Sequence, residues 1–371
     1  MPQSTREHRP LAMWILALIL TVMGGCASLR KPTQNRHADR TAKIPPSVAP
    51  AVTETPPPQA LPEISILTPF VIALGPDGNL WFTELRRSQI GRITPSAQIS
   101  TYDLGSGTMA DRLAAGPDDS IWFTDPAGNR IGRLGLDGTT AYIPLETPES
   151  GPAGIVKASD GNLWFTEHAV NRVGRVTPLG TLTEFVLPHG GSPAGIAEGS
   201  DGKLYVAENS GDRIDRISMN GQVQEFLLPT PGSRPDSIVR GADGAVWFTE
   251  FGADKIGRLT PSGQIKEYSL AAHGPPVGIT AGADGNVWVT VPAAHAICKL
   301  APDGTEAAYY LANDIMPGMI AAADDGYLWF TQPSGKIGRF SPAGAVQEFP
   351  AVLTARRALK VESERPPISE P

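Results

Sequence analysis

The sequence contains little cysteine and no excess of positive charge, and each shortage excludes a class of protein. Only Cys26 and Cys298 occur among its 371 residues, which excludes a disulfide framework and a metal site built from cysteines. The 31 Lys and Arg residues are outnumbered by 38 Asp and Glu, giving a formal net charge of −7. Nucleic-acid-binding domains normally carry a basic patch or stripe, so nucleic acid is not an expected partner.

A helical pattern is missing as well. The 40 Gly and 36 Pro residues disfavour helix interiors, and the apolar residues of the repeated units described below do not recur with a helical period. Hydrophobic residues nevertheless make up 41% of the chain and charged residues 19%, a composition typical of a globular protein. The chain is therefore predicted to fold as an all-β protein.

The first 26 residues resemble an export signal. Arg6 and Arg9 precede a short apolar run, residues 11–22, which falls short of the roughly 20 residues that span a membrane as a helix. Two glycines then precede Cys26, an arrangement that resembles the lipobox of bacterial lipoproteins and implies lipidation of that cysteine. The alternatives are an ordinary secretory signal or an uncleaved anchor. In each case the protein is expected outside the cytoplasm, and in the lipoprotein case a lipid anchor is its only membrane contact.

Two further segments flank the part expected to fold. Residues 27–62 are rich in proline, including a run of three at 56–58, and predict an extended, disordered linker. Residues 354–371 are polar and proline-tipped and are expected to be disordered. The predicted divisions are therefore a signal segment (1–26), the linker (27–62), a folded domain (63–353) and a tail (354–371).

Within the folded domain one unit recurs seven times at intervals of 41 or 42 residues. Its aromatic position is occupied by Trp81, Trp122, Trp164, Tyr205, Trp247, Trp288 and Trp329. Each copy contains four short β-branched and aromatic runs separated by Asp-Gly and Pro-x-Gly turn signals, which predict four strands, A to D. A period of this length with four strands per unit is typical of a β-propeller, so seven copies predict seven blades.

The aromatic residues of the repeat are predicted to form the core. Packing blades around an axis buries the Trp and Phe of each blade against its neighbours, removing on the order of 150–250 Å² per side chain from water. This favours a core role over a ligand platform. Ring closure is left open: residues 63–67 look like a fourth strand, yet the last copy already has one at 345–349. The N-terminal strand either pairs there or leads into the first blade.

The repeated phrase WFTE…IGR[IL]TPxGxIxE[YF], which covers residues 63–350, resembles that of the virginiamycin B lyase family. The resemblance implies a streptogramin-linearising propeller that opens a cyclic depsipeptide at its ester by elimination. It also implies a histidine that removes the proton next to the carbonyl, and Mg²⁺, held by acidic side chains, that stabilises the enolate-like charge. In that family the histidines follow the proline that opens an innermost strand.

This sequence departs from the family at those positions. The slot after the proline, or after Ala110 in the second copy, holds Phe70, Asp111, Ala153, Ala194, Asp236, Val277 and Gly318. None of the seven is a histidine. In the two copies that align best with the catalytic pair, the slots hold Asp236 and Val277, and Pro275 stands where an acidic metal ligand is expected. Valine neither accepts a proton nor binds a metal, so the lyase chemistry is not expected in the family's form.

Charged residues at two of these slots are the candidate ligand-binding residues. Because strands alternate in direction, the starts of all A strands surround one mouth of the central channel. Asp111 and Arg112 of copy 2 and Arg234 and Asp236 of copy 5 are predicted there, and blades 2 and 5 lie nearly opposite in a ring of seven. They could bind a polar ligand or a cation, and Asp111 and Asp236 are also the candidate metal ligands. Solvated loop charges or local salt bridges are the alternative.

Loop histidines and a second ring of charge complete the candidates. His168, His189 and His273 are candidate bases at the same end, where His295 also lies, although loop histidines are more often solvated than catalytic. Acids end most B strands and cations lie on the C strands; Glu84 and Arg92 in the first copy predict an ion-pair ladder rather than a metal site. Cys298 is expected to be an inert buried thiol.

The function favoured by these observations is a propeller of the bacterial cell envelope that resembles virginiamycin B lyase and binds a polar small molecule or an envelope protein at the channel mouth. The alternative is a carbon–oxygen lyase acting on streptogramin B, or a lactonase, with a rearranged site built from Asp111, Asp236 and a loop histidine. A third possibility is a flat face that binds another protein and tolerates loss of both aspartates.

Overall fold

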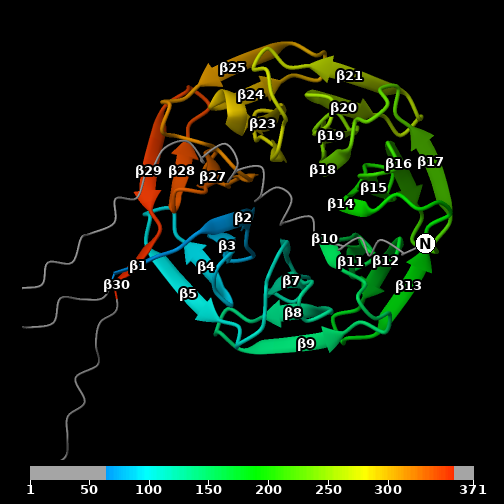
Figure 1. The fold of residues 1–371 in the computed structure, drawn as a ribbon, viewed down its shortest axis with the longest axis horizontal. Coiled ribbons are helices and arrows are strands. Elements are labelled where there is room, and N and C mark those ends of the chain that lie inside the picture. The colour runs from blue at the N-terminus through cyan, green and yellow to red at the C-terminus, as the bar shows by residue number, and fades with distance from the viewer. Residues whose placement is uncertain (1–63, 355–371) are drawn as a thin grey trace, which may run out of the picture.

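The computed structural model describes residues 64–354, and Figure 1 shows them as a ring of blades viewed along its axis. Seven four-stranded antiparallel sheets surround this axis, each with its strands in chain order from A on the inside to D on the outside. The predicted all-β, seven-bladed propeller is confirmed. The predicted signal segment, Cys26, the linker and all of the tail after residue 354 lie outside the described residues.

Blades 1 to 4 occupy the first part of the ring. Blade 1 contains β2 (Pro69–Leu74), β3 (Leu80–Glu84), β4 (Gln89–Ile93) and β5 (Ile99–Asp103); blade 2 contains β6 (Leu113–Ala115), β7 (Ile121–Asp125), β8 (Arg130–Leu134) and β9 (Thr140–Pro144). Blade 3 contains β10 (Pro152–Lys157), β11 (Leu163–Glu167), β12 (Arg172–Val176) and β13 (Leu182–Val186); blade 4 contains β14 (Pro193–Glu198), β15 (Leu204–Glu208), β16 (Arg213–Ile217) and β17 (Val223–Leu227).

Blades 5 to 7 complete the ring. Blade 5 contains β18 (Pro235–Arg240), β19 (Val246–Glu250), β20 (Lys255–Leu259) and β21 (Ile265–Ser269); blade 6 contains β22 (Ile279–Ala281), β23 (Val287–Val291), β24 (Ala296–Leu300) and β25 (Glu306–Tyr310). Blade 7 contains β26 (Ile320–Ala322), β27 (Leu328–Gln332), β28 (Lys336–Phe340) and β29 (Val346–Pro350). Residues 64–354 also contain one 3₁₀ turn, η1 (Pro292–Ala294), and no helix there has the length and apolar character needed to cross a membrane.

The B strands form the core of each blade. All five residues of each B strand are buried, because neighbouring blades cover both faces of the sheet, whereas the outermost D strands are half exposed. The buried aromatic side chains also anchor the turns: the Trp81 indole N–H donates to Asp77 at 2.9 Å, and the same bond recurs at Trp122 with Asp118. The repeated aromatic residues are therefore core, as predicted.

A phenylalanine on strand B faces a glycine on strand C in five blades. In blade 1 a Cβ added to Gly91 would lie 2.0 Å from the Phe82 ring, so only glycine fits beneath it. Blades 4 and 6 change both partners: Val206 faces Asp215, and Val289 faces Cys298. The smaller valine makes room for the larger partner. Cys298 is fully buried, and burial raises the pKa of its thiol to about 12, which agrees with the predicted inert thiol.

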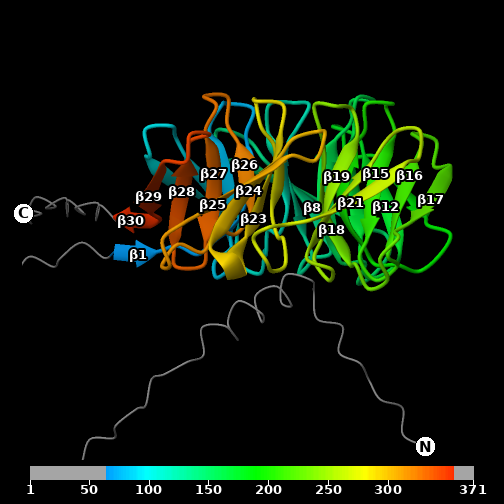
Figure 2. The same ribbon diagram turned by 90° about the horizontal axis from the view of Figure 1, so that it is seen from above.

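A separate two-stranded sheet closes the ring. Strand β1 (Ile64–Ile66) pairs antiparallel with β30 (Val352–Thr354), and the Leu67 N–H donates to the Ala351 carbonyl at 2.8 Å. This sheet projects from the side of the propeller and adds no strand to blade 7 (Figure 2). The first and last blades are also joined by the Thr331 hydroxyl, which donates to the Phe70 carbonyl at 2.8 Å.

Candidate functional site

Charged side chains from opposite sides of the ring meet at one mouth of the channel. The Arg112 guanidinium, just before β6 in blade 2, lies with Nη2 3.8 Å from Oδ2 of Asp236, on β18 in blade 5. Its Nη1 lies 3.8 Å from the sulfur of Met319, just before β26 in blade 7. Because blades 2 and 5 are not neighbours, a contact between their innermost segments spans the channel. The structure therefore brings together Asp236 and Arg112 at the axis.

Buried threonines on the B strands hold these innermost segments in place. The Arg112 N–H donates to the Thr124 hydroxyl at 3.1 Å, and the Ser237 N–H donates to the Thr249 hydroxyl at 3.0 Å. The Thr124 hydroxyl in turn donates to the Ala153 carbonyl of blade 3 at 2.9 Å. A threonine thus holds the backbone after the slot in every blade except blade 4, where Ala207 replaces it, while the slot residue itself differs between blades.

The mouth is more negative than positive, and its carboxylates are poorly compensated. Asp111 and Asp236 are only 8% and 4% exposed. Burial raises the pKa of Asp111, opposed by the charge of Arg112 and reinforced by the charge of Asp236. The second oxygen of Asp236, Oδ1, is buried and has no hydrogen-bond partner among the described residues. We will call Asp111, Arg112 and Asp236 the axial trio.

Arg234 does not join the axial trio. Its backbone is left-handed (φ 49°), the residue is exposed, and its guanidinium lies 5.5 Å from the centre of the Phe251 ring. The predicted placement of four charged residues in one funnel therefore holds for three of them. Met319, whose sulfur contacts Arg112, was not among the predicted residues. Its only sequence signal is that it takes the place of glycine after the slot of the last copy.

Magnesium does not fit the axial trio. Mg²⁺ requires a near-octahedral set of oxygen ligands, whereas the trio offers two carboxylates and places a guanidinium 3.8 Å from one of them. Within residues 64–354 no group of three or more His, Cys, Asp or Glu side chains is arranged to hold a metal ion.

The candidate histidines lie at the mouth-side end of the propeller but make different contacts. Nδ1 of His168 lies 3.3 Å from the Pro193 carbonyl, at the start of an innermost strand. Nδ1 of His189 lies 2.8 Å from Oε1 of Glu225, on an outermost strand, and the His189 side chain is exposed. His273 is exposed, and Nδ1 of His295 lies 3.0 Å from the Ile315 carbonyl. None of these three contacts is to a carboxylate of the axial trio.

The predicted ion-pair ladder between Glu84 and Arg92 is wrong. Thr83 pairs with Ile90, one residue out of the predicted register, so Arg92 lies opposite Trp81 and on the other face from Glu84. Arg92 instead pairs with Asp77 of the A-to-B turn, Nη1 to Oδ2, at 3.5 Å. In blades 1 and 2 the acid that ends the B strand binds the loop before the A strand: Glu84 accepts from the Thr68 N–H, and Asp125 accepts from the Met109 N–H at 3.0 Å.

Blade 4 contains a buried charge cluster that the repeat did not predict. It consists of Glu208, Arg213, Asp215 and Glu225, with His189 at its exposed edge. Three carboxylates share the single guanidinium of Arg213, and burial raises the pKa of Glu208 to about 8 and that of Asp215 to about 6. Arg213 also donates to the His189 carbonyl at 2.5 Å, so the cluster secures the loop that enters blade 4. The sequence signal was Asp215 in place of the repeat's glycine.

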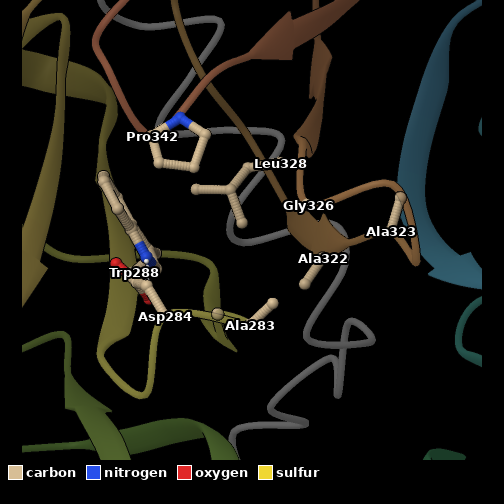
Figure 3. Close-up of a pocket in the computed structure, with 9 residues that line it drawn as sticks. Ala283, Asp284, Trp288, Ala322, Ala323, Gly326, Leu328 and Pro342 are labelled. Atoms are coloured by element: carbon tan, nitrogen blue, oxygen red, sulfur yellow. Dashed lines mark hydrogen bonds between the residues drawn. The ribbon is translucent and has the colours of Figure 1, made fainter.

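A pocket of about 290 Å³ opens at the opposite end of the propeller, between blades 6 and 7. Figure 3 shows its wall of Trp288, Leu328, Pro342 and three alanines, with Asp284 beside the indole. At the matching junction of blades 3 and 4, Glu198 accepts from the Ser159 N–H at 3.0 Å and from its hydroxyl. Ala322 and Ala283 occupy those two positions here. The pocket therefore lies at a junction between blades that lacks the hydrogen-bonded bridge that Ser159 and Glu198 form between blades 3 and 4.

Comparison with known proteins agrees with the fold and the repeat. The chain matches the Virginiamycin B lyase family over residues 37–192 and 188–365. It is similar to the solved structure of a streptogramin B lyase, with 34% identity, 78% of this chain and 95% of that chain covered, and a TM-score of 0.71. It is also similar to virginiamycin B lyase from Staphylococcus aureus, with 35% identity, 75% and 97% covered, and a TM-score of 0.70.

A third similar structure contains an inactive variant. It is a catalytically inactive histidine-to-alanine variant of the Staphylococcus aureus enzyme with quinupristin, 35% identical, with 75% of this chain and 98% of that chain covered and a TM-score of 0.70. No curated protein sequence matches this chain.

Proposed function

This chain belongs to the virginiamycin B lyase family, and we propose that it binds a polar ligand at the axial trio without opening it by lyase chemistry. The observation that carries the proposal is the contact of Arg112 with Asp236 across the channel. Blades 2 and 5 are far apart in the sequence, and each has charged residues where most other copies of the repeat have uncharged ones. The charged side chains of the two blades are in contact. Solvated loop residues that had drifted independently would have no reason to face each other.

The slots after the innermost prolines support binding over lyase activity. All seven lack an imidazole, and one inactive relative differs from its parent by the loss of a single histidine. Asp111 and Asp236 are buried carboxylates beside a cation, a setting suited to holding a charged or hydrogen-bonding ligand. A ligand at the axial trio would contact residues of blades 2, 5 and 7 together.

The rival reading is a lyase or lactonase with a rearranged site. It needs a base beside the trio. The candidate is His168, whose Nδ1 lies 3.3 Å from the carbonyl of Pro193, at the start of an innermost strand. His189 and His295 point their Nδ1 atoms at Glu225 and at the Ile315 carbonyl. A docked protein at the mouth, the remaining alternative, would not require the buried oxygen of Asp236.

The two readings separate in one experiment with quinupristin, which is present in the structure of the inactive relative. The full chain is incubated with quinupristin, with and without Mg²⁺, and the mixture is analysed by chromatography and mass spectrometry. Elimination gives an isomer of unchanged mass and hydrolysis a product heavier by one water. We expect neither product, while calorimetry detects binding.

Variants of the trio test the location of that binding. Asp236→Asn should weaken quinupristin binding about tenfold or more, because a charged hydrogen-bond partner is lost. The control is Asp314→Asn, which removes the same charge from an exposed loop at the same end of the propeller. Ring opening that disappears in His168→Ala would establish the rearranged enzyme instead. Absence of binding, or binding insensitive to Asp236→Asn, would overturn the proposal.

We also propose that the protein acts at the cell envelope through a lipid on Cys26. The support is the short apolar run followed by two glycines and cysteine, all outside the described residues. Metabolic labelling with a fatty acid in a bacterial host should mark the wild-type chain and leave Cys26→Ser unlabelled. Labelling that survives Cys26→Ser would contradict the anchor.

A further inference from the structure

The axial trio leaves one buried oxygen without a partner. The side chain of Asp236 is 6% exposed, and its Oδ1 accepts no hydrogen bond from any described residue. Its Oδ2 lies 3.8 Å from Arg112, which is an ion-pair distance and too long for a hydrogen bond. Buried carboxylate oxygens without a partner also occur inside the blades, as at Glu250 of blade 5, but that of Asp236 belongs to a carboxylate that meets Arg112 across the channel, where a ligand could supply the missing donor.

The charges around that oxygen define what the donor should be. When both aspartates are ionised, two carboxylates and one guanidinium leave the trio negative, and the charge of Asp236 acts on Asp111. An anionic ligand would gain Arg112 but would face two carboxylates. A cation with hydrogen-bond donors satisfies both the charge and the empty oxygen, and an ammonium group provides three N–H donors.

We propose that the ligand of the axial trio is a small molecule bearing a protonated amine, whose ammonium group donates to Asp236 and Asp111 and displaces Arg112 from Asp236. This inference rests on the proposed function and narrows it to a ligand class. Arg112 is then a competing cation that occupies the site when the ligand is absent. The long contact suits that role, because a guanidinium held by two short hydrogen bonds would be harder to displace.

A matched series of four-carbon probes tests the class. These are 1,4-diaminobutane, 1,4-butanediol and succinate, which are similar in length and differ in charge, titrated into the full chain by calorimetry at low ionic strength. We expect heat of binding with the diamine alone. Binding of succinate but not the diamine would overturn the proposal, and equal binding of all three would show non-specific association and overturn it too.

Two variants that break the same ion pair should act in opposite directions. Asp236→Asn removes the acceptor and should weaken diamine binding about tenfold or more. Arg112→Gln removes the competitor and should strengthen it several-fold. If the salt bridge had only a structural role, both variants would change the diamine affinity in the same direction. Asp314→Asn, on an exposed loop, should leave the affinity unchanged. If Arg112→Gln and Asp236→Asn both weaken diamine binding, Arg112 does not compete with the ligand and the proposal is overturned.

The pH dependence provides a further check that does not involve a variant. Burial raises the pKa of Asp111, with Arg112 and Asp236 as the charges acting on it. Diamine affinity should therefore fall as the pH is lowered through that raised pKa, because Asp111 becomes neutral. If quinupristin binds in a manner that depends on Asp236 while the diamine does not bind, the ligand class is wrong and the proposed function stands. If neither binds, both fail.

Discussion

Departures from the repeat differ between the blade interiors and the channel mouth. Inside a blade they are compensated by a neighbour on the adjacent strand: Val206 with Asp215 in blade 4, and Val289 with Cys298 in blade 6. At the mouth, Arg112 of blade 2 meets Asp236 of blade 5 across the axis. Compensation within a sheet preserves packing. The contact between distant blades instead brings opposite charges together across the channel, where a ligand could meet them.

Blades 4 and 6 show how much freedom packing alone permits. Both replace the repeat's Phe by Val, and both fill the space from strand C. In blade 4 the residue that fills this space is Asp215, which is part of the charge cluster with Glu208, Arg213 and Glu225. In blade 6 the corresponding positions are Val291, Ala296 and Ala308, and Cys298 packs among apolar side chains. The space left by the missing Phe thus accepts either a charged or an uncharged side chain, provided that the neighbouring side chains of the blade are of the same kind.

The largest expected effect comes from breaking a pair inside a blade. Gly91→Cys places a side chain where a Cβ alone would lie 2.0 Å from the Phe82 ring, and we expect a loss of about 3 kcal/mol in the free energy of unfolding. Adding Phe82→Val reproduces the pair of blade 6 and should recover a large part of that loss. Chemical denaturation of the single and double variants measures both. A double variant less stable than Gly91→Cys would contradict pairwise compensation.

The charge cluster of blade 4 should make stability depend on pH. Burial raises the pKa of Glu208 from 4.5 to about 8, so the folded protein binds a proton that the unfolded chain releases, and stability falls as the pH rises through that interval. Glu208→Gln should reduce this dependence, to which Glu167 and Glu250 also contribute because burial raises their pKa values to about 7 and about 8. It should also raise the free energy of unfolding above pH 8 by roughly 1–3 kcal/mol. Thermal denaturation across that range measures it.

The control for this prediction is Glu146→Gln, on an exposed loop, which should leave the pH profile unchanged. A Glu208→Gln profile that overlays the wild-type one would show that the cluster binds no extra proton.

Breaking the axial pair should affect stability much less. The Arg112–Asp236 contact is single and long, and Asp236→Asn leaves Arg112 beside Asp111 while removing the charge of Asp236 that acts on Asp111, so Asp236→Asn should change the free energy of unfolding by about 1 kcal/mol or less. Urea denaturation measures the change. A loss comparable to that of Gly91→Cys would place the axial trio among the structural pairs and remove its distinction from the blade interiors.

The smallest effect is expected at the junction of blades 6 and 7. The double variant Ala283→Ser with Ala322→Glu rebuilds the bridge that Ser159 and Glu198 form between blades 3 and 4. We expect a gain of about 0.5–1 kcal/mol, since a hydrogen-bonded bridge would partly fill the pocket. The melting temperatures of the double variant and of each single variant test this. A gain in Ala322→Glu alone would show that filling volume, rather than the bridge, is responsible.

The sequence predicted the propeller well because the repeat encodes each blade locally. Turn signals, the buried Trp and the Phe–Gly pair lie within one unit, so seven units give seven blades. It also predicted that Asp111, Arg112 and Asp236 would share the mouth, because ring position follows from copy number. Closure by β1 and β30 was undetermined, since it depends on pairing between the two ends of the chain.

Side-chain direction was harder to predict than position. A register error of one residue placed Arg92 on the wrong face of its hairpin. Arg234 lies beside the Phe251 ring and has a left-handed backbone, and no pattern of apolar residues reveals either feature. The charge cluster of blade 4 needed a comparison of equivalent positions across strands B and C, where Asp215 and Val206 change together.

The most direct test measures affinity and stability on one variant. Asp236→Asn is titrated with quinupristin by calorimetry and unfolded with urea, beside the wild-type chain. We expect the affinity to fall about tenfold or more while the free energy of unfolding shifts by about 1 kcal/mol or less. Unchanged affinity together with a large loss of stability would contradict it, because the axial trio would then hold the propeller together and not a ligand.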